Sequence, residues 1–172
     1  MKKIKIRDVV LCALFAALSA VLSQVSIPIG PVPINFVHFG VFTAAGLLGA
    51  KRGALSQIIF VLIGLAGAPV FSNFLGGIGV LAGPTGGFIL SYILCAFIAG
   101  IIIDRFGISV KTLTIAFFTG WVITYLFGIP WFMYVTGMNL QSTAAFMLQF
   151  LPGDVIKTIL SIIVIRRLKN II

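Results

Sequence analysis

The sequence predicts an all-α integral membrane protein built as one bundle of six transmembrane helices. Hydrophobic residues make up 60% of the 172 residues, charged residues only 9%, and the mean hydropathy is +1.24. Soluble domains carry about 25% charged residues, so a soluble fold would have too little polar surface. The length suits one membrane-embedded domain over residues 1–172, with no separate soluble domain.

Six apolar runs have about the length that a transmembrane helix requires, which is about 20 residues. The second run is short but extendable. The runs are too long and too uniformly apolar for strands of a membrane barrel, which alternate over about 10 residues. The first run follows a basic N-terminus without a clear cleavage site, so we interpret it as a retained span. The six predicted spans cover residues 8–27, 35–50, 53–71, 84–103, 111–130 and 152–165.

The distribution of charge predicts the orientation of these spans. If six spans alternate across the membrane, eleven of the 12 basic residues fall on one side, together with Asp8 and Asp104. The positive-inside rule makes that side cytoplasmic, so both termini are expected there. The connections on the other side contain no charged residue. The basic residues on the cytoplasmic side are Lys2, Lys3, Lys5, Arg7, Lys51, Arg52, Arg105, Lys111, Arg166, Arg167 and Lys169.

The connections on the outer side have distinctive compositions. Residues 28–34 are punctuated by prolines and cannot be helical. Residues 72–83 are apolar and rich in glycine, and such a loop can dip back into a bundle when protein covers it. Residues 131–151 form the longest connection, in which residues 143–150 are expected to form a short helix. Four aromatic residues are expected to be interface anchors: Trp121, Tyr125, Trp131 and Tyr134.

Several classes of function are excluded by what the sequence lacks. No basic run is interleaved with aromatic residues as nucleic-acid binding requires. Cys12 and Cys95 lie in apolar runs and are interpreted as small core residues, and a single histidine, His38, gives no metal-ligand spacing. We expect no metal and no cofactor. No nucleophile–base motif is present, so an enzyme is disfavoured, and without a nucleotide-binding motif any ATP-driven transport needs partner subunits.

Asp154 and Lys157 form the strongest candidate for a binding site. They are the two charged residues that do not fall on the cytoplasmic side. Pro152 suits the first turn of a helix, and residues three apart share a helix face, so the two side chains should project together. Charge inside a span is costly and is therefore usually functional or paired. The pair predicts a site for a polar solute near the outer face, and the alternative is a structural ion pair between helices.

Three further residues are candidates for the same pocket. Thr85 lies in a Gly-Pro-Thr-Gly-Gly segment that permits close approach of backbone or ligand, and Tyr92 follows about two turns deeper. Asn73 offers a donor and an acceptor within the glycine-rich loop. The alternatives are a tightly packed helix entry for Thr85 and Tyr92, and simple surface exposure for Asn73. His38 is interpreted as a structural histidine, and Gln57 is placed near the inner face, outside the pocket.

Small residues four apart in the first span allow close packing of helices. Ala13 and Ala17 form one ridge, and Ala16 and Ala20 form another. Such a ridge packs either inside the bundle or against a partner membrane protein, and the sequence does not choose between the two.

Taken together, these segments resemble the BioY family, the biotin-specific substrate-binding (S) components of energy-coupling factor (ECF) transporters. The resemblance covers nearly the whole chain. The most specific stretches are the Gly-Pro-Thr-Gly-Gly-Phe and Pro-Gly-Asp-Val-Ile-Lys segments, in that order. The stretches that carry the resemblance are residues 31–34, 47–54, 64–71, 83–88 and 152–157.

The resemblance implies a six-helix S component that binds biotin from outside. Asp154 and Lys157 match the polar motif on the family's last helix, and Asn73 lies in the matching loop. The Ala13 and Ala17 ridge matches the motif by which S components dock onto the transmembrane coupling subunit. Two cytoplasmic ATPase subunits would then drive reorientation of the S component in the membrane.

The sequence departs from the family's pattern at one place. After the Pro-Val-Pro-Ile segment, members often continue Thr-Leu-Gln-x-Phe, whereas this chain has Asn35-Phe36-Val37-His38-Phe39. The departure leaves open whether the second span contributes to the pocket and whether the ligand is biotin or a related molecule.

The main hypothesis is high-affinity biotin binding and uptake as the substrate-capture subunit of an ATP-driven transporter in a prokaryotic cell membrane. Asp154 would accept the ureido N–H groups, Lys157 would pair with Asp154 or reach the ligand carbonyl, and Asn73 would add a hydrogen bond. Phe and Trp side chains of the outer segments would cover the ring system. The alternatives are a stand-alone ion-coupled carrier for biotin or a related vitamin, with Asp154 as its protonation site, and a structural membrane scaffold.

Overall fold

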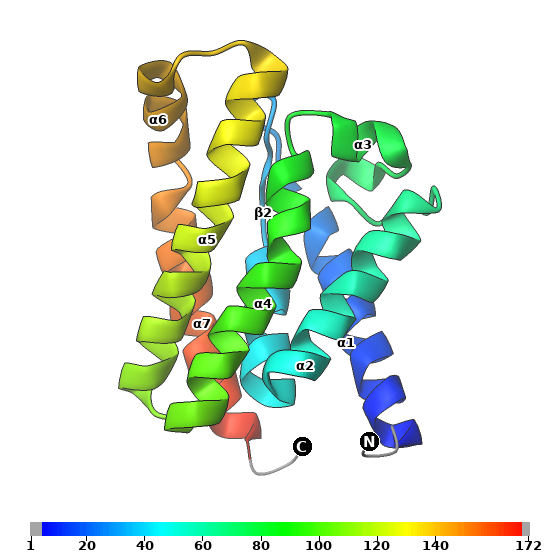
Figure 1. The fold of residues 1–172 in the computed structure, drawn as a ribbon, viewed down its shortest axis with the longest axis vertical. Coiled ribbons are helices and arrows are strands. Elements are labelled where there is room, and N and C mark those ends of the chain that lie inside the picture. The colour runs from blue at the N-terminus through cyan, green and yellow to red at the C-terminus, as the bar shows by residue number, and fades with distance from the viewer. Residues whose placement is uncertain (1–4, 170–172) are drawn as a thin grey trace.

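A computed structural model describes residues 5–169 as an all-helical bundle with one small hairpin (Figure 1). Lys2 and Lys3, which the charge argument includes, lie outside the described residues. In chain order the elements are α1 (Ile6–Gln24), β1 (Ser26–Ile27), β2 (Ile34–Asn35), α2 (Val37–Leu65), the 3-10 turn η1 (Ser72–Phe74), α3 (Ile78–Ala82), α4 (Gly86–Phe106), α5 (Val110–Thr136), α6 (Leu140–Leu148) and α7 (Leu151–Leu168).

The second and third predicted spans form a single helical element with a break inside it. Gly49 has φ 78° and ψ −179°, a conformation that is essentially restricted to glycine. It divides α2 into arms of residues 37–48 and 50–65, and the chain reverses there at the lower end of Figure 1. The Asp104 carboxylate accepts a hydrogen bond from the backbone N–H of Ala50 at 2.9 Å and so caps the second arm.

Two predicted helix ends were wrong. The third span was expected to reach Phe71, but α2 ends at Leu65, and Phe71 folds back to pack edge-on against Phe60, with ring centroids 5.5 Å apart. The fifth was expected to end at Pro130, but α5 continues to Thr136 and ends at Gly137, in the left-handed conformation. Membrane helices tolerate an internal proline because neighbouring groups satisfy the freed carbonyl.

Four helices within residues 5–169 are long and apolar enough to cross a membrane: α1, α2, α4 and α5. The pair α6 and α7, bent by 48°, is a fifth candidate. The number of candidate spans is lower than the six predicted transmembrane helices because both arms of α2 belong to one helical element. The predicted short helix over residues 143–150 corresponds to α6, which begins and ends slightly earlier.

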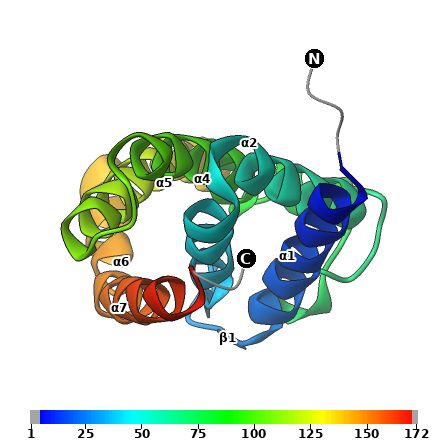
Figure 2. The same ribbon diagram turned by 90° about the horizontal axis from the view of Figure 1, so that it is seen from below.

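The first arm of α2 lies at the centre of the bundle, between α1 and α7 (Figure 2). Gly40 of this arm faces Ser19 of α1, and Gly46 faces Ile165 of α7. Behind it, Phe42 stacks on Phe117 of α5 with ring centroids 4.4 Å apart. The described ends of the chain lie together at one end of the molecule, and the β1–β2 hairpin, α3 and α6 lie towards the other (Figure 1).

We expect Gly49→Ala to lower the melting temperature of the detergent-solubilised protein, at a cost of about 1–3 kcal/mol for the strained backbone. The added Cβ would also meet the Asp104 carboxylate. Gly107→Ala is the matched control, because Gly107 has φ 76° but open space around its Cα. A larger drop in melting temperature for Gly49→Ala than for Gly107→Ala would measure the additional cost of disturbing the Asp104 cap. Equal stability of Gly49→Ala and wild type would contradict this account of the break.

Candidate ligand-binding cavity

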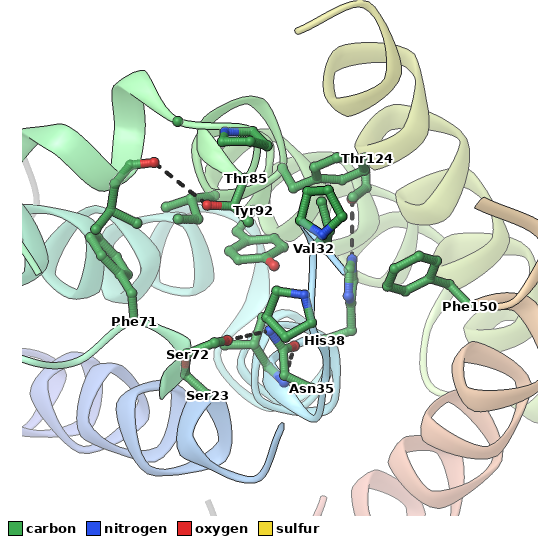
Figure 3. Close-up of a pocket in the computed structure, with 18 of the residues that line it drawn as sticks. Ser23, Val32, Asn35, His38, Phe71, Ser72, Thr85, Tyr92, Thr124 and Phe150 are labelled. Atoms are coloured by element: carbon green, nitrogen blue, oxygen red, sulfur yellow. Dashed lines mark hydrogen bonds between the residues drawn. The ribbon is translucent and has the colours of Figure 1, made fainter. Parts of the chain in front are cut away.

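A cavity of about 320 Å³ lies between the hairpin, the start of α2, the segment from η1 to α4, and helices α5 to α7. This volume is within the usual range for small-molecule sites, about 300–1,000 Å³. Figure 3 shows side chains from these separate elements pointing towards one space. The proline-containing loop between β1 and β2 and the glycine-rich segment before α4 both contribute to its wall, so both outer connections turn back onto the bundle.

Asp154 and Lys157 lie in this cavity as a buried ion pair. Their residues are 3% and 2% exposed, and Lys157 Nζ lies 2.9 Å from Asp154 Oδ1. The geometry follows from the local sequence, because Pro152 stands in the first turn of α7 and places both residues on one face. The Tyr125 hydroxyl on α5 donates to Asp154 Oδ2 at 2.7 Å. Each carboxylate oxygen therefore has one partner, which offsets part of the cost of burying the charge.

All five residues predicted to bind substrate line the same cavity. Asp154, Lys157 and Tyr92 are buried, whereas Thr85 is half-buried and Asn73 is exposed. Asn73 has φ 61°, which asparagine tolerates better than most residues, and its Oδ1 accepts a hydrogen bond from Ser26 at 3.1 Å. It therefore lies at the rim of the cavity, whereas the ion pair lies at its floor. Whether these residues bind substrate stays a prediction.

Tyr125 does not lie where the sequence predicts it. It was expected to be an interface anchor, but it lines the cavity and bonds to Asp154. A tyrosine within an apolar run was the available signal, but the pairing across 29 residues of sequence depends on how α5 packs on α7. Of the other expected anchors, Trp131 donates its indole N–H to the Gly83 carbonyl at 2.9 Å, and Tyr134 is 86% exposed.

The start of α2 contributes to the cavity, a question that the sequence left open. His38 was interpreted as structural, and its ring does pack edge-on against Tyr92, with centroids 5.1 Å apart, and contacts Thr124 Oγ1 at 3.4 Å. It nevertheless lines the cavity, as does Asn35, whose side-chain amide donates to Ser72 Oγ at 2.7 Å (Figure 3). These residues occupy the positions where the sequence departs from the family pattern.

The remaining wall is largely apolar and aromatic. Phe71, Phe88 and Phe150 line the cavity, and of these Phe150 belongs to the outer segments, so the expectation that their phenylalanines cover a ring system stays a prediction. Trp131 is not among the lining residues. Gln57 also lies outside the cavity, as expected, and bonds to Ser19 at 3.2 Å. Within residues 5–169, no group of histidine, cysteine and acidic side chains could hold a metal ion.

The two small-residue ridges of α1 have opposite surroundings. Ala16 is buried and Ala20 half-buried, so that ridge packs inside the bundle. Ala13 and Ala17 are exposed on the face of α1 that points away from the bundle. The Ala13 and Ala17 ridge is therefore available to a partner, and its docking role stays a prediction.

The fold and the cavity define a multi-pass membrane protein with a cavity of small-molecule size between its helices. Comparison with known proteins identifies the family. The model of the BioY family matches residues 1–172, and the chain belongs to the BioY family.

Curated relatives include a probable biotin transporter BioY of Pyrococcus horikoshii, 38% identical over 96% of this chain and 98% of the relative. The biotin transporter BioY of Rhizobium etli is 37% identical over 90% of this chain and 89% of the relative. A crystal structure of the S-component for biotin from an ECF-type ABC transporter is also similar. It aligns with a TM-score of 0.89 at 31% identity, and the match covers 96% of this chain and 92% of the other.

We expect the two members of the buried ion pair to be strongly coupled. Lys157→Met should cost about 3–5 kcal/mol, because it leaves Asp154 charged and uncompensated. The double variant Asp154→Asn with Lys157→Met should cost less than the sum of the single variants. Thermal melting of the ligand-free protein in detergent measures the stability of Lys157→Met, Asp154→Asn and the double variant.

The partly exposed Arg52–Asp8 pair, 2.8 Å apart, is the control, and Arg52→Gln should cost no more than about 1 kcal/mol. If the stability costs of the two single variants simply add up to that of the double variant, Asp154 and Lys157 are not coupled.

Proposed function

We propose that this protein is the substrate-binding component through which biotin enters the cell, working with an ATP-driven ECF module. One observation carries the proposal: the cavity of a BioY-family chain encloses the hydrogen-bonded set of Asp154, Lys157 and Tyr125 at its floor. A scaffold protein has little reason to place a buried ion pair at a cavity wall, because a desolvated pair is a poor source of stability.

The hydrogen-bonding capacity at the floor suits a ureido group. That group has two N–H donors and one carbonyl acceptor. The Asp154 carboxylate has about four lone-pair positions, of which Lys157 and Tyr125 occupy two, and the Lys157 ammonium has three donors, of which Asp154 takes one. Asp154 can therefore accept from the ligand N–H groups while Lys157 donates to its carbonyl.

The rest of the cavity suits the remainder of biotin. Phe71, Phe88 and Phe150 provide an apolar surface for the fused rings, and Tyr92 and Thr85 lie along the wall. Asn73 at the rim adds a hydrogen bond to the bound ligand. Neither a cofactor nor chemical conversion of the ligand is part of the proposal, since the relatives are transporters.

We infer six membrane crossings with both termini in the cytoplasm. The two arms of α2 count as separate crossings, because the chain reverses at Gly49 (Figure 1). The basic connections at that reversal and between α4 and α5, and the basic end of α7, lie at the same end of the molecule as the described termini. The positive-inside rule places this end in the cytoplasm of a prokaryotic cell.

The inferred partners are a transmembrane coupling subunit and two cytoplasmic ATPase subunits. The chain itself has no nucleotide-binding motif, so the energy of ATP must come through other proteins. The exposed ridge of Ala13 and Ala17 suits close contact with a helix of the coupling subunit, because small side chains allow two backbones to approach.

Replacing Asp154 by asparagine should weaken biotin binding at least about tenfold, since hydrogen bonds to charged groups contribute about 1.5–3 kcal/mol. Calorimetry on the purified, detergent-solubilised chain measures the affinity. Asp8→Asn is the matched control: the same change outside the cavity should leave biotin affinity unaltered. Unchanged affinity in a folded Asp154→Asn variant would rule out the proposed role of this carboxylate.

Cysteine labelling of intact cells should show α6 on the outer side and the α4–α5 connection on the cytoplasmic side. Gln141→Cys on α6 is expected to react with a membrane-impermeant maleimide from outside, and Lys111→Cys only after lysis. Both positions are exposed, whereas the native Cys12 and Cys95 are buried. Labelling of both positions from the same side would contradict the topology.

Leucine at both Ala13 and Ala17 should disrupt assembly with the coupling subunit and leave biotin binding intact, because the two residues face away from the cavity. Co-purification of the partners and calorimetry of the isolated chain measure the two effects. Ala145→Leu, the same change at an exposed position of α6, serves as control. Full retention of the partners would show that the ridge is not the docking surface.

A further inference from the structure

The charges that line the cavity balance each other at its floor, and its rim carries none. Among the lining residues that the structure describes, Asp154 and Lys157 are the charged ones, and they pair at 2.9 Å. The exposed lining residues that form the rim, including Pro31, Asn73 and Leu75, are neutral. An anionic group therefore finds no unpaired cation anywhere along the described wall.

Among residues 5–169, no other lysine or arginine lies near the cavity. The remaining lysines and arginines fall before or at the start of α1, at the reversal of α2, around the α4–α5 connection and at the end of α7. The described parts of those segments lie at the end of the molecule away from the hairpin, α3 and α6 (Figure 1). None of these basic residues that the structure describes lines the cavity.

The two ends of biotin make different electrostatic demands. The valerate tail carries the molecule's one ionised group, whereas the ureido ring is neutral. A carboxylate at the floor would add a second negative charge beside Asp154, with one ammonium to serve both, in a site removed from water. An unbalanced buried charge is strongly disfavoured. The neutral ring at the floor avoids this cost, and the carboxylate at the exposed rim keeps its hydration.

We propose, resting on biotin as the ligand, that the ring enters first and that the carboxylate stays at the rim without a cationic partner. The protein consequently also captures biotin derivatives that are amidated at the tail. The ligand class includes biotinamide and biotinyl-lysine. In both, a neutral amide replaces the valerate carboxylate, and biotinyl-lysine carries in addition the zwitterionic amino-acid group of lysine beyond that amide. Biotinamide tests the charge alone because it has nearly the shape of biotin, and biotinyl-lysine tests whether the tail end of the cavity is open.

The test compares the three ligands on the purified wild-type chain by calorimetry or by competition with labelled biotin. Biotinamide and biotinyl-lysine should bind within about tenfold of biotin, because no protein cation is lost from the complex. Biotinamide binding more than about a hundredfold weaker than biotin would overturn the proposal, since such a loss requires an ionic contact to the carboxylate. Tight binding of biotinamide with loss of biotinyl-lysine would overturn the extension to larger amides.

A variant separates the two roles open to Lys157. If Lys157 contacts the ring, Lys157→Gln should weaken biotin and biotinamide by the same factor. If it holds the carboxylate, the variant should weaken biotin alone, which would contradict ring-first binding. Arg52→Gln, at the α2 reversal, should leave both affinities unchanged. Failure of folded wild-type protein to bind biotin at all would instead refute the proposed function, and the inference with it.

Discussion

The structure depends on pairing two charged side chains inside an apolar bundle. A lone Asp154 or a lone Lys157 would be costly in this environment, so each stabilises the other, and the Tyr125 hydroxyl gives the carboxylate a further donor. The Tyr125 bond thereby links α5 to α7. The pairing also explains why α7 begins with a proline-containing turn: an acid in its first turn and a base three residues on project to one side.

The other elements provide the enclosure that the pair requires. The bend of 48° between α6 and α7 brings Phe150 and Met147 to the cavity wall, close in sequence to the acid they help shield. On the opposite side, the first arm of α2 enters the centre of the bundle and presents His38, and β2 just before it presents Asn35. That arm can end and reverse because Gly49 adopts a backbone conformation closed to other residues and Asp104 caps the second arm. The α2 reversal and the cavity thus lie towards opposite ends of the molecule.

Much of this could be read from the sequence, for identifiable physical reasons. Hydropathy locates the helices because a lipid-facing bundle must be apolar, and the Asp154–Lys157 spacing is a local property of one helix. Tyr125 and Asn35 could not be assigned, because their roles depend on packing between segments far apart in the sequence. The ends at Leu65 and Thr136 were missed for a related reason. Tertiary contacts, such as Phe71 against Phe60, determine where an apolar run stops being helical.

The central claim is that the buried pair exists to recognise a ligand and does not merely fasten α7. The most direct measurement is an experimental structure of the biotin complex. We expect the ureido nitrogens within hydrogen-bond distance of the Asp154 carboxylate and the ureido oxygen near Lys157, with the Tyr125 bond to Asp154 retained. A complex in which biotin occupies the cavity but makes no contact with Asp154 or Lys157 would contradict the claim, and would leave the pair a structural fastening of the helix.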